Sequence, residues 1–137
     1  MIKLLLVDDE PLVRKGLRMR LASEPDLVVG GEATNGKEAL VLAEALHPDV
    51  VLMDIELPLM DGIAATQALH AFSPELAVII LTIHDDEATR AQAQAAGATA
   101  FITKSGANGE LLRIIRQAVQ ERCTPNRSEK QSGQNST

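Results

Sequence analysis

The chain has 137 residues, is 45% hydrophobic and carries a formal net charge of −6 at pH 7, which fits one globular domain of ordinary size. An acidic chain is repelled by nucleic-acid phosphates, and two Phe without Trp or Tyr offer little surface on which bases or sugars could stack. The single Cys excludes a disulfide framework, and the sequence shows neither a secretory leader nor a membrane-spanning apolar stretch. We therefore expect a cytoplasmic domain with no membrane contact.

Five short apolar runs alternate with amphipathic or alanine-rich stretches along the chain. The predicted strands cover residues 2–7, 27–33, 49–53, 77–82 and 99–103. The predicted helices cover residues 11–21, 37–46, 63–72, 85–96 and 107–122. Continuously apolar strands predict burial on both faces, whereas the more polar second strand predicts a position nearer the edge. Right-handed crossovers then give an α/β fold with a doubly wound sheet of five parallel strands.

Polar residues follow the predicted strands where each strand ends. The first strand leads into Asp8 and Asp9, the third into Asp54, the fourth ends at Thr82, and the fifth leads into Lys104. Parallel strands place their carboxyl ends along one edge of a sheet, and ligands bind in the crevice there. The sequence therefore predicts that these five residues converge on one polar pocket.

The charges of this pocket indicate its chemistry. Asp8, Asp9 and Asp54 bring three negative charges and Lys104 one positive charge, and carboxylates packed closely repel one another strongly. A Mg²⁺ ion would balance the pocket, and it prefers a few carboxylates while keeping positions for phosphate oxygens. Asp54 could then act as a nucleophile toward phosphorus, with the Thr82 hydroxyl donating to a phosphoryl oxygen.

The ordered set of motifs resembles the receiver domain of two-component response regulators. It consists of Asp8-Asp9, Asp54 with Leu57-Pro58-Leu59-Met60-Asp61-Gly62, Thr82 and Lys104. The resemblance covers residues 2 to about 122 and implies a flavodoxin-like (βα)5 fold with strand order 2-1-3-4-5. It implies a signalling switch that accepts a phosphoryl group on Asp54 from a sensor histidine kinase, rather than a multiple-turnover enzyme.

The resemblance also assigns a magnesium site. Asp9 would bind Mg²⁺ directly and Asp8 mostly through water, while Asp54 and the backbone carbonyl of Glu56 would complete the protein ligands.

Two further roles follow from the resemblance. Thr82 and Phe101 match the switch pair, in which the hydroxyl moves to the phosphoryl group and the ring turns inward behind it. Glu56 and His84 occupy the rim positions that tune how long the phosphoryl group survives.

Ser105-Gly106 follows Lys104 where many receivers have Pro, and this departure resembles the NarL/FixJ-type subfamily. Members of that subfamily control transcription through a DNA-binding effector domain, and a homodimer formed on phosphorylation is a hypothesis from the same resemblance. We expect a receiver domain at residues 1–122 and a disordered tail or linker remnant at 123–137, which lacks apolar residues beyond Pro and Cys. The chain is then either a receiver-only protein acting by protein–protein contact or part of a longer regulator.

Two other functions compete with this interpretation. An aspartyl-phosphate phosphatase would have its nucleophile on the first strand and a substrate-covering cap, for which this chain has no room. A flavodoxin-like cofactor binder would need a Gly- or Ser/Thr-rich phosphate cradle after the first strand, where this chain has Asp8-Asp9-Glu10-Pro11. Each site residue taken alone has an ordinary structural explanation, so the prediction depends on the set.

Overall fold

The computed structural model describes residues 1–83, 86–104 and 108–123, apart from the side chains at 108, 109, 122 and 123. Five parallel strands of this part of the chain form one sheet in the order β2-β1-β3-β4-β5, as predicted. The strands are β1 (Ile2–Val7), β2 (Leu27–Ala33), β3 (Val50–Asp54), β4 (Ala77–Thr82) and β5 (Ala100–Thr103). The helices are α1 (Pro11–Ala22), α2 (Gly36–Leu46), α3 (Gly62–Phe72), α4 (Glu87–Ala95) and α5 (Asn108–Cys123).

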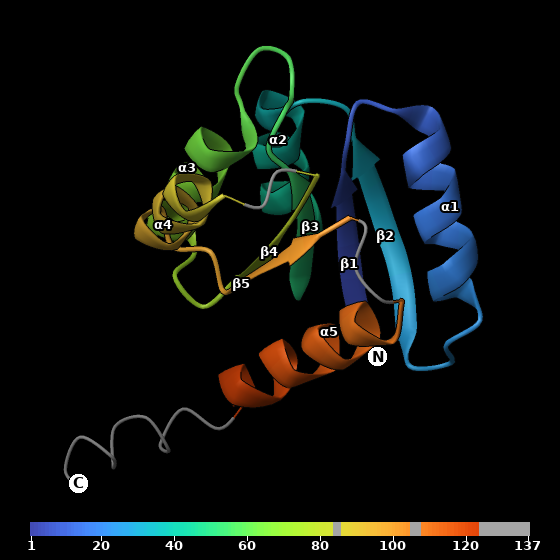
Figure 1. The fold of residues 1–137 in the computed structure, drawn as a ribbon. Coiled ribbons are helices and arrows are strands. Elements are labelled where there is room, and N and C mark those ends of the chain that lie inside the picture. Colours follow the sequence, from blue (N-terminus) through green and yellow to red (C-terminus); the bar gives the residue numbers. More distant parts are fainter. Residues whose placement is uncertain (84–85, 105–107, 124–137) are drawn as a thin grey trace, which may run out of the picture.

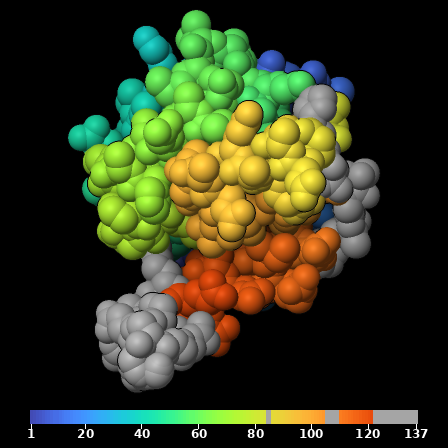
Figure 2. Space-filling view, turned by 60° about the vertical axis from the view of Figure 1, so that its left-hand side comes forward, coloured from blue at the N-terminus to red at the C-terminus, as the bar shows by residue number. Residues whose placement is uncertain are grey.

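The sheet lies between two layers of helices (Figure 1). Alternate residues of the strands face opposite layers, so Leu4 and Leu6 of β1 pack with α1 and α5, whereas Leu5 and Val7 pack with α2, α3 and α4. Figure 2 shows α4, in yellow, beside α3, in green, on the surface of the second layer. This aliphatic core fixes the strands, and with them the positions of the residues at their carboxyl ends.

The helix starts follow from polar capping residues. The side chains of Asn35, Asp61 and Asp86 each accept a hydrogen bond from a backbone N–H in the first turn of α2, α3 and α4. Helices α2 and α3 therefore begin at the glycine directly after the cap, one residue before the predicted starts. Strand β3 begins and ends one residue later than predicted, so that Asp54 is its last residue.

The edge position predicted for the second strand is confirmed, because β2 forms one end of the sheet. Its pairing with β1 shifts by one residue between Leu4 and Leu5, which leaves Gly30 as the extra residue of a bulge. Among the helices that the structure describes, none is both long and apolar enough to cross a membrane. Helix α5 ends at Cys123, so it includes the first residue of the tail predicted at 123–137. Residues 124–137 of that tail lie outside the described residues.

Candidate functional site

The carboxyl ends of neighbouring strands bring together residues that are far apart in sequence. Asp8 follows β1, Asp54 ends β3, Thr82 ends β4 and Lys104 follows β5. The Nζ atom of Lys104 lies 2.9 Å from Oδ2 of Asp8 and 3.4 Å from Oδ1 of Asp54. One ammonium group therefore bridges two carboxylates that belong to adjacent strands.

Asp8, Asp9 and Asp54 form an all-oxygen cluster. One carboxylate oxygen from each residue lies within 4.8 Å of the other two. Asp8 and Asp54 are 3% and 8% exposed, whereas Asp9 is exposed to solvent. Hard divalent cations such as Mg²⁺ prefer oxygen ligands of this kind, so the donor set fits magnesium. The ion could reach the cluster from the solvent side, where Asp9 is exposed.

Burial and neighbouring charges shift the protonation of this cluster. The pKa of Asp54 is raised to about 6, chiefly by burial and to a smaller degree by the charge of Asp8, while Lys104 opposes the rise. Burial alone would lower the pKa of Lys104, but its hydrogen bond to Asp8 and the charges of Asp54 and Asp8 raise it overall. At neutral pH the lysine is therefore a cation, and Asp54 is mainly ionised with a basicity unusual for an aspartate.

The loop after β3 holds Asp54 by a close backbone approach at Gly62. The N–H of Gly62 donates to the carbonyl of Ile55 at 2.8 Å. A Cβ at position 62 would lie 2.0 Å from the carbonyl oxygen of Asp54, so no other residue fits without moving the backbone of Asp54. Leu59 takes a left-handed φ of 71° in this loop, and Asp61 caps α3. The Asp61-Gly62 pair is thus a structural requirement of the site.

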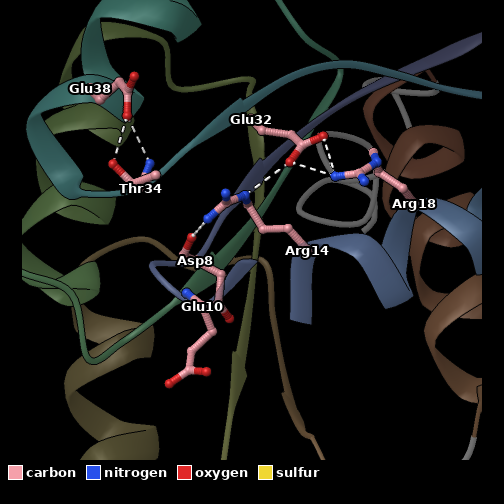
Figure 3. A network of polar contacts seen from close by, with 7 residues as sticks. All are labelled: Asp8, Glu10, Arg14, Arg18, Glu32, Thr34 and Glu38. Carbon is pink, nitrogen blue, oxygen red and sulfur yellow. Dashed lines mark hydrogen bonds and ion pairs between the residues drawn. The ribbon is translucent and has the colours of Figure 1, made fainter. Parts of the chain in front are cut away.

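The turn after β1 holds Asp8 through both its side chain and its backbone. Oδ1 of Asp8 accepts from the N–H of Glu10 at 2.9 Å, and the Asp8 N–H donates to the carbonyl of Ala33 at 3.1 Å. Nη1 of Arg14 donates to the Asp8 carbonyl at 2.6 Å (Figure 3). Sequence reasoning missed Arg14, although one signal was available: it lies one helical turn after the acidic run.

Thr82 and Phe101 lie on the neighbouring strands. Thr82 is 1% exposed, and its carbonyl accepts from the N–H of Lys104 at 2.7 Å, which fixes the start of the turn after β5. Phe101 is half-buried on β5, and the guanidinium carbon of Arg90 on α4 lies 4.5 Å from the centroid of its ring.

The structure describes one of the two predicted rim residues. Glu56 is exposed in the loop two residues after Asp54. His84 lies outside the described residues. The rim function of both stays a prediction.

The sequence profile of the response regulator receiver domain matches residues 4–116. GacA, a response regulator of Pseudomonas aeruginosa, is 39% identical over 117 residues, which cover 85% of this chain and 55% of GacA. A protein-glutamate methylesterase/protein-glutamine glutaminase of Methanosarcina mazei is 35% identical over 120 residues, which cover 87% of this chain and 34% of that protein. The chain thus spans about half or less of these curated relatives.

The fold agrees with the sequence match. A crystal structure of a LuxR-family two-component response regulator from Aurantimonas superimposes with a TM-score of 0.84 at 35% identity, covering 88% of this chain and 86% of the other. The receiver domain of a NarL response regulator from Mycobacterium tuberculosis superimposes with a TM-score of 0.81 at 32% identity, covering 87% of this chain and 96% of the other. The expected flavodoxin-like strand order, the resemblance to receivers and the likeness to NarL-type regulators are confirmed. The chain belongs to the family of receiver domains of two-component response regulators.

Proposed function

We propose that this domain is a phosphorylation-activated switch in which Asp54 accepts a phosphoryl group from a histidine kinase with Mg²⁺. The observation that carries the proposal is the position of the Asp54 carboxylate, 3.4 Å from the Lys104 ammonium and inside the acidic cluster with Asp8 and Asp9. A carboxylate in contact with a cation, at the end of a buried strand, is a suitable acceptor for phosphorus.

Magnesium would be held by the side chains of Asp8, Asp9 and Asp54, with the backbone carbonyl of Glu56 as a further ligand. When bound, the ion supplies positive charge to the oxygens of the transferring phosphoryl group. The oxygen-only donor set and its excess of negative charge support this assignment.

In the transfer, a carboxylate oxygen of Asp54 bonds to phosphorus while the P–N bond of a phosphohistidine breaks. The imidazole nitrogen keeps the electron pair and takes up a proton. Asp54 must be ionised for this attack, and its raised pKa of about 6 leaves it mainly ionised at pH 7 while making it more nucleophilic than an ordinary aspartate. Lys104, whose pKa is raised by its carboxylate partners, is positioned to contact the new charge on Asp54.

The switch follows from the added phosphoryl charge. A phosphoryl group brings acceptor oxygens and additional negative charge to the site, and Lys104 and the Thr82 hydroxyl would bind them by charge-assisted hydrogen bonds. Movement of Thr82 would make room for Phe101 to turn inward, which would change the surface formed by α4, β5 and α5. Glu56 and His84 at the rim would set how long the phosphoryl group survives by placing or excluding water.

The output is transcription control through a DNA-binding effector domain in the same protein, with a homodimer formed on phosphorylation. Support comes from the relatives, which include response regulators and transcriptional regulators of about twice the matched length. A switch that takes its phosphoryl group from such a kinase and controls DNA would act in the cytoplasm.

The test is intact mass spectrometry after incubation with Mg²⁺ and a small phosphodonor. The wild type should gain one phosphoryl group, and chelation of the metal or the Asp54→Asn substitution should abolish the gain. Asp26→Asn is a matched control, because it changes the same group just before β2, at the end of the parallel sheet opposite to the cluster. Labelling that persists in Asp54→Asn would overturn the proposal, and catalytic turnover of the phosphodonor without labelling would favour a phosphatase instead.

A further inference from the structure

Arg14 on α1 links the acidic turn after β1 to the edge strand β2. Its side chain is 15% exposed, and its guanidinium contacts two partners at once (Figure 3). Nη1 donates to the carbonyl oxygen of Asp8 at 2.6 Å, and Nε pairs with Oε1 of Glu32 at 2.9 Å. A planar guanidinium, whose donors have a fixed geometry, holds such a bridge more rigidly than an ammonium on a flexible stem.

The Asp8 carbonyl belongs to the peptide bond that joins Asp8 to Asp9. Fixing this carbonyl therefore fixes the direction in which the chain leaves β1 and the direction in which Asp9 starts. Asp8 is also held through its N–H and its carboxylate, but Asp9 is exposed. The peptide before Asp9 is held by Arg14 through the Asp8 carbonyl, and the peptide after it is held by Oδ1 of Asp8 through the Glu10 N–H. Arg14 therefore supplies one of the two backbone constraints on where the exposed carboxylate of the cluster points.

Because Glu32 offsets the charge of Arg14, the bridge acts mainly by fixing the backbone geometry and less by adding positive charge to the site. The Glu32 carboxylate pairs with Arg14 and also accepts from Nη1 of Arg18 at 2.8 and 2.9 Å. The negative charge of Glu32 offsets that of the Arg14 guanidinium close to the site. If Arg14 acted through its positive charge alone, its removal would strengthen binding of a cation to the acidic cluster, whereas loss of a positioning contact would weaken it.

We propose that Arg14 is a positioning residue for the cation site, holding the Asp8–Asp9 peptide so that Asp9 can join Asp8 and Asp54 as a ligand. This inference rests on the proposed function, because it presumes that the cluster binds Mg²⁺. Groups that orient metal ligands typically account for about a 10–100-fold change in metal affinity. Loss of Arg14 should therefore weaken Mg²⁺ binding by about tenfold, at the lower end of that range.

The chain provides a matched control in Arg18, which pairs with the same carboxylate from the next turn of α1. In the part of the chain that the structure describes, the contacts of Arg18 do not reach the turn after β1. Arg14→Met and Arg18→Met each remove one positive charge and one ion pair with Glu32. Only the first also removes the hydrogen bond to the Asp8 carbonyl.

The experiment measures Mg²⁺ affinity by isothermal titration calorimetry, since the chain has no Trp or Tyr to report binding by fluorescence. We expect about tenfold weaker binding for Arg14→Met and wild-type binding for Arg18→Met. We also expect the amide resonance of Asp9, whose N–H shares the peptide plane with the Asp8 carbonyl, to shift without metal in Arg14→Met alone. At saturating Mg²⁺, phosphorylation of Asp54 should return toward the wild-type extent.

Several results would overturn the inference. They are equal Mg²⁺ affinities for the two variants, tighter binding by Arg14→Met, and an Asp9 resonance at its wild-type position. If Arg14→Met does not fold, Arg14→Lys replaces it. Lysine lacks the rigid fork of guanidinium donors that holds the Asp8 carbonyl and Glu32 in a fixed geometry, so Mg²⁺ affinity should still fall several-fold. Wild-type affinity in Arg14→Lys would refute the idea. A wild-type protein that does not bind Mg²⁺ would refute the proposed metal site itself, which separates that failure from failure of the Arg14 role.

Discussion

Replacing Lys104 by Met removes the cation that lies between the two buried carboxylates. Its Nζ is 3.4 Å from Asp54, and Coulomb's law with an effective dielectric of about 20 gives about 5 kcal/mol for unit charges at that distance. This is an upper bound, because the lysine side chain is 23% exposed and a neighbouring cation usually shifts a carboxyl pKa by about 1–3 units. Since Lys104 opposes the rise in the pKa of Asp54, its removal should raise that pKa from about 6 by at least about one unit.

The assay is a carboxyl carbon NMR titration of protein labelled at aspartate, without metal, with the Asp54 signal assigned from Asp54→Asn. Lys15→Met is the control, because Lys15 is exposed on α1 and the substitution makes the same charge change. The Asp54 midpoint should rise in Lys104→Met and stay near 6 in the control. A midpoint that is unchanged or lower in Lys104→Met would refute the electrostatic argument for the site.

Three further predictions concern the same part of the molecule. The pKa of Asp54 is raised from 3.8 to about 6, so without metal this group stabilises the folded state below pH 4, and the stabilisation of up to about 3 kcal/mol is lost as the pH rises through 6. Urea unfolding at a series of pH values should show this loss in the wild type but not in Asp54→Asn. Identical pH profiles of the unfolding free energy in the two proteins would contradict the prediction. Gly62→Ala should lower the unfolding free energy by about 3 kcal/mol or more and abolish phosphorylation, because its Cβ would lie 2.0 Å from the Asp54 carbonyl oxygen. The control Gly16→Ala, whose Cβ would meet nothing within 4 Å, should be neutral or stabilising. Equal unfolding midpoints for the two variants would refute the close approach. Arg90→Ala removes a cation–π contact of about 0.5–1 kcal/mol and should shift the ring resonances of Phe101 while those of Phe72 stay fixed, and an unmoved Phe101 would show that Arg90 does not hold the ring.

The fold was predictable because its signals are local. Apolar runs such as 50–53 are continuous where strands are covered on both faces, and Asn35-Gly36 and Asp61-Gly62 mark helix starts by capping chemistry. Helices α2 and α3 begin one residue before their predicted starts because the glycine directly after each cap is already helical. Helix α4 begins two residues after its predicted start, because Asp86 is its cap. Strand order came from the family resemblance, since hydrophobic pattern alone does not say which strands are neighbours.

The convergence of site residues was predictable from a rule about parallel sheets, which places Asp8, Asp54 and Lys104 at one edge whatever their side chains do. The contacts of Arg14 were not predictable in this way. A long side chain can reach several partners, and which it contacts depends on rotamers and on the bulge that sets the register of β2 against β1. The same holds for Arg116 of α5, which pairs with Asp26 at 2.8 Å across 90 residues of sequence. Predicting which ion pairs form between elements far apart in sequence requires the three-dimensional arrangement of those elements.

The most direct test of the central claim is a crystal structure of the protein grown with Mn²⁺, which substitutes for Mg²⁺ and can be located by anomalous scattering. We expect one strong anomalous peak within coordination distance of carboxylate oxygens from Asp8 or Asp9 and from Asp54, and its loss in Asp9→Asn. A peak elsewhere on the molecule, or no peak in a protein that still phosphorylates Asp54, would contradict the claim that these residues form a cation site around a reactive aspartate.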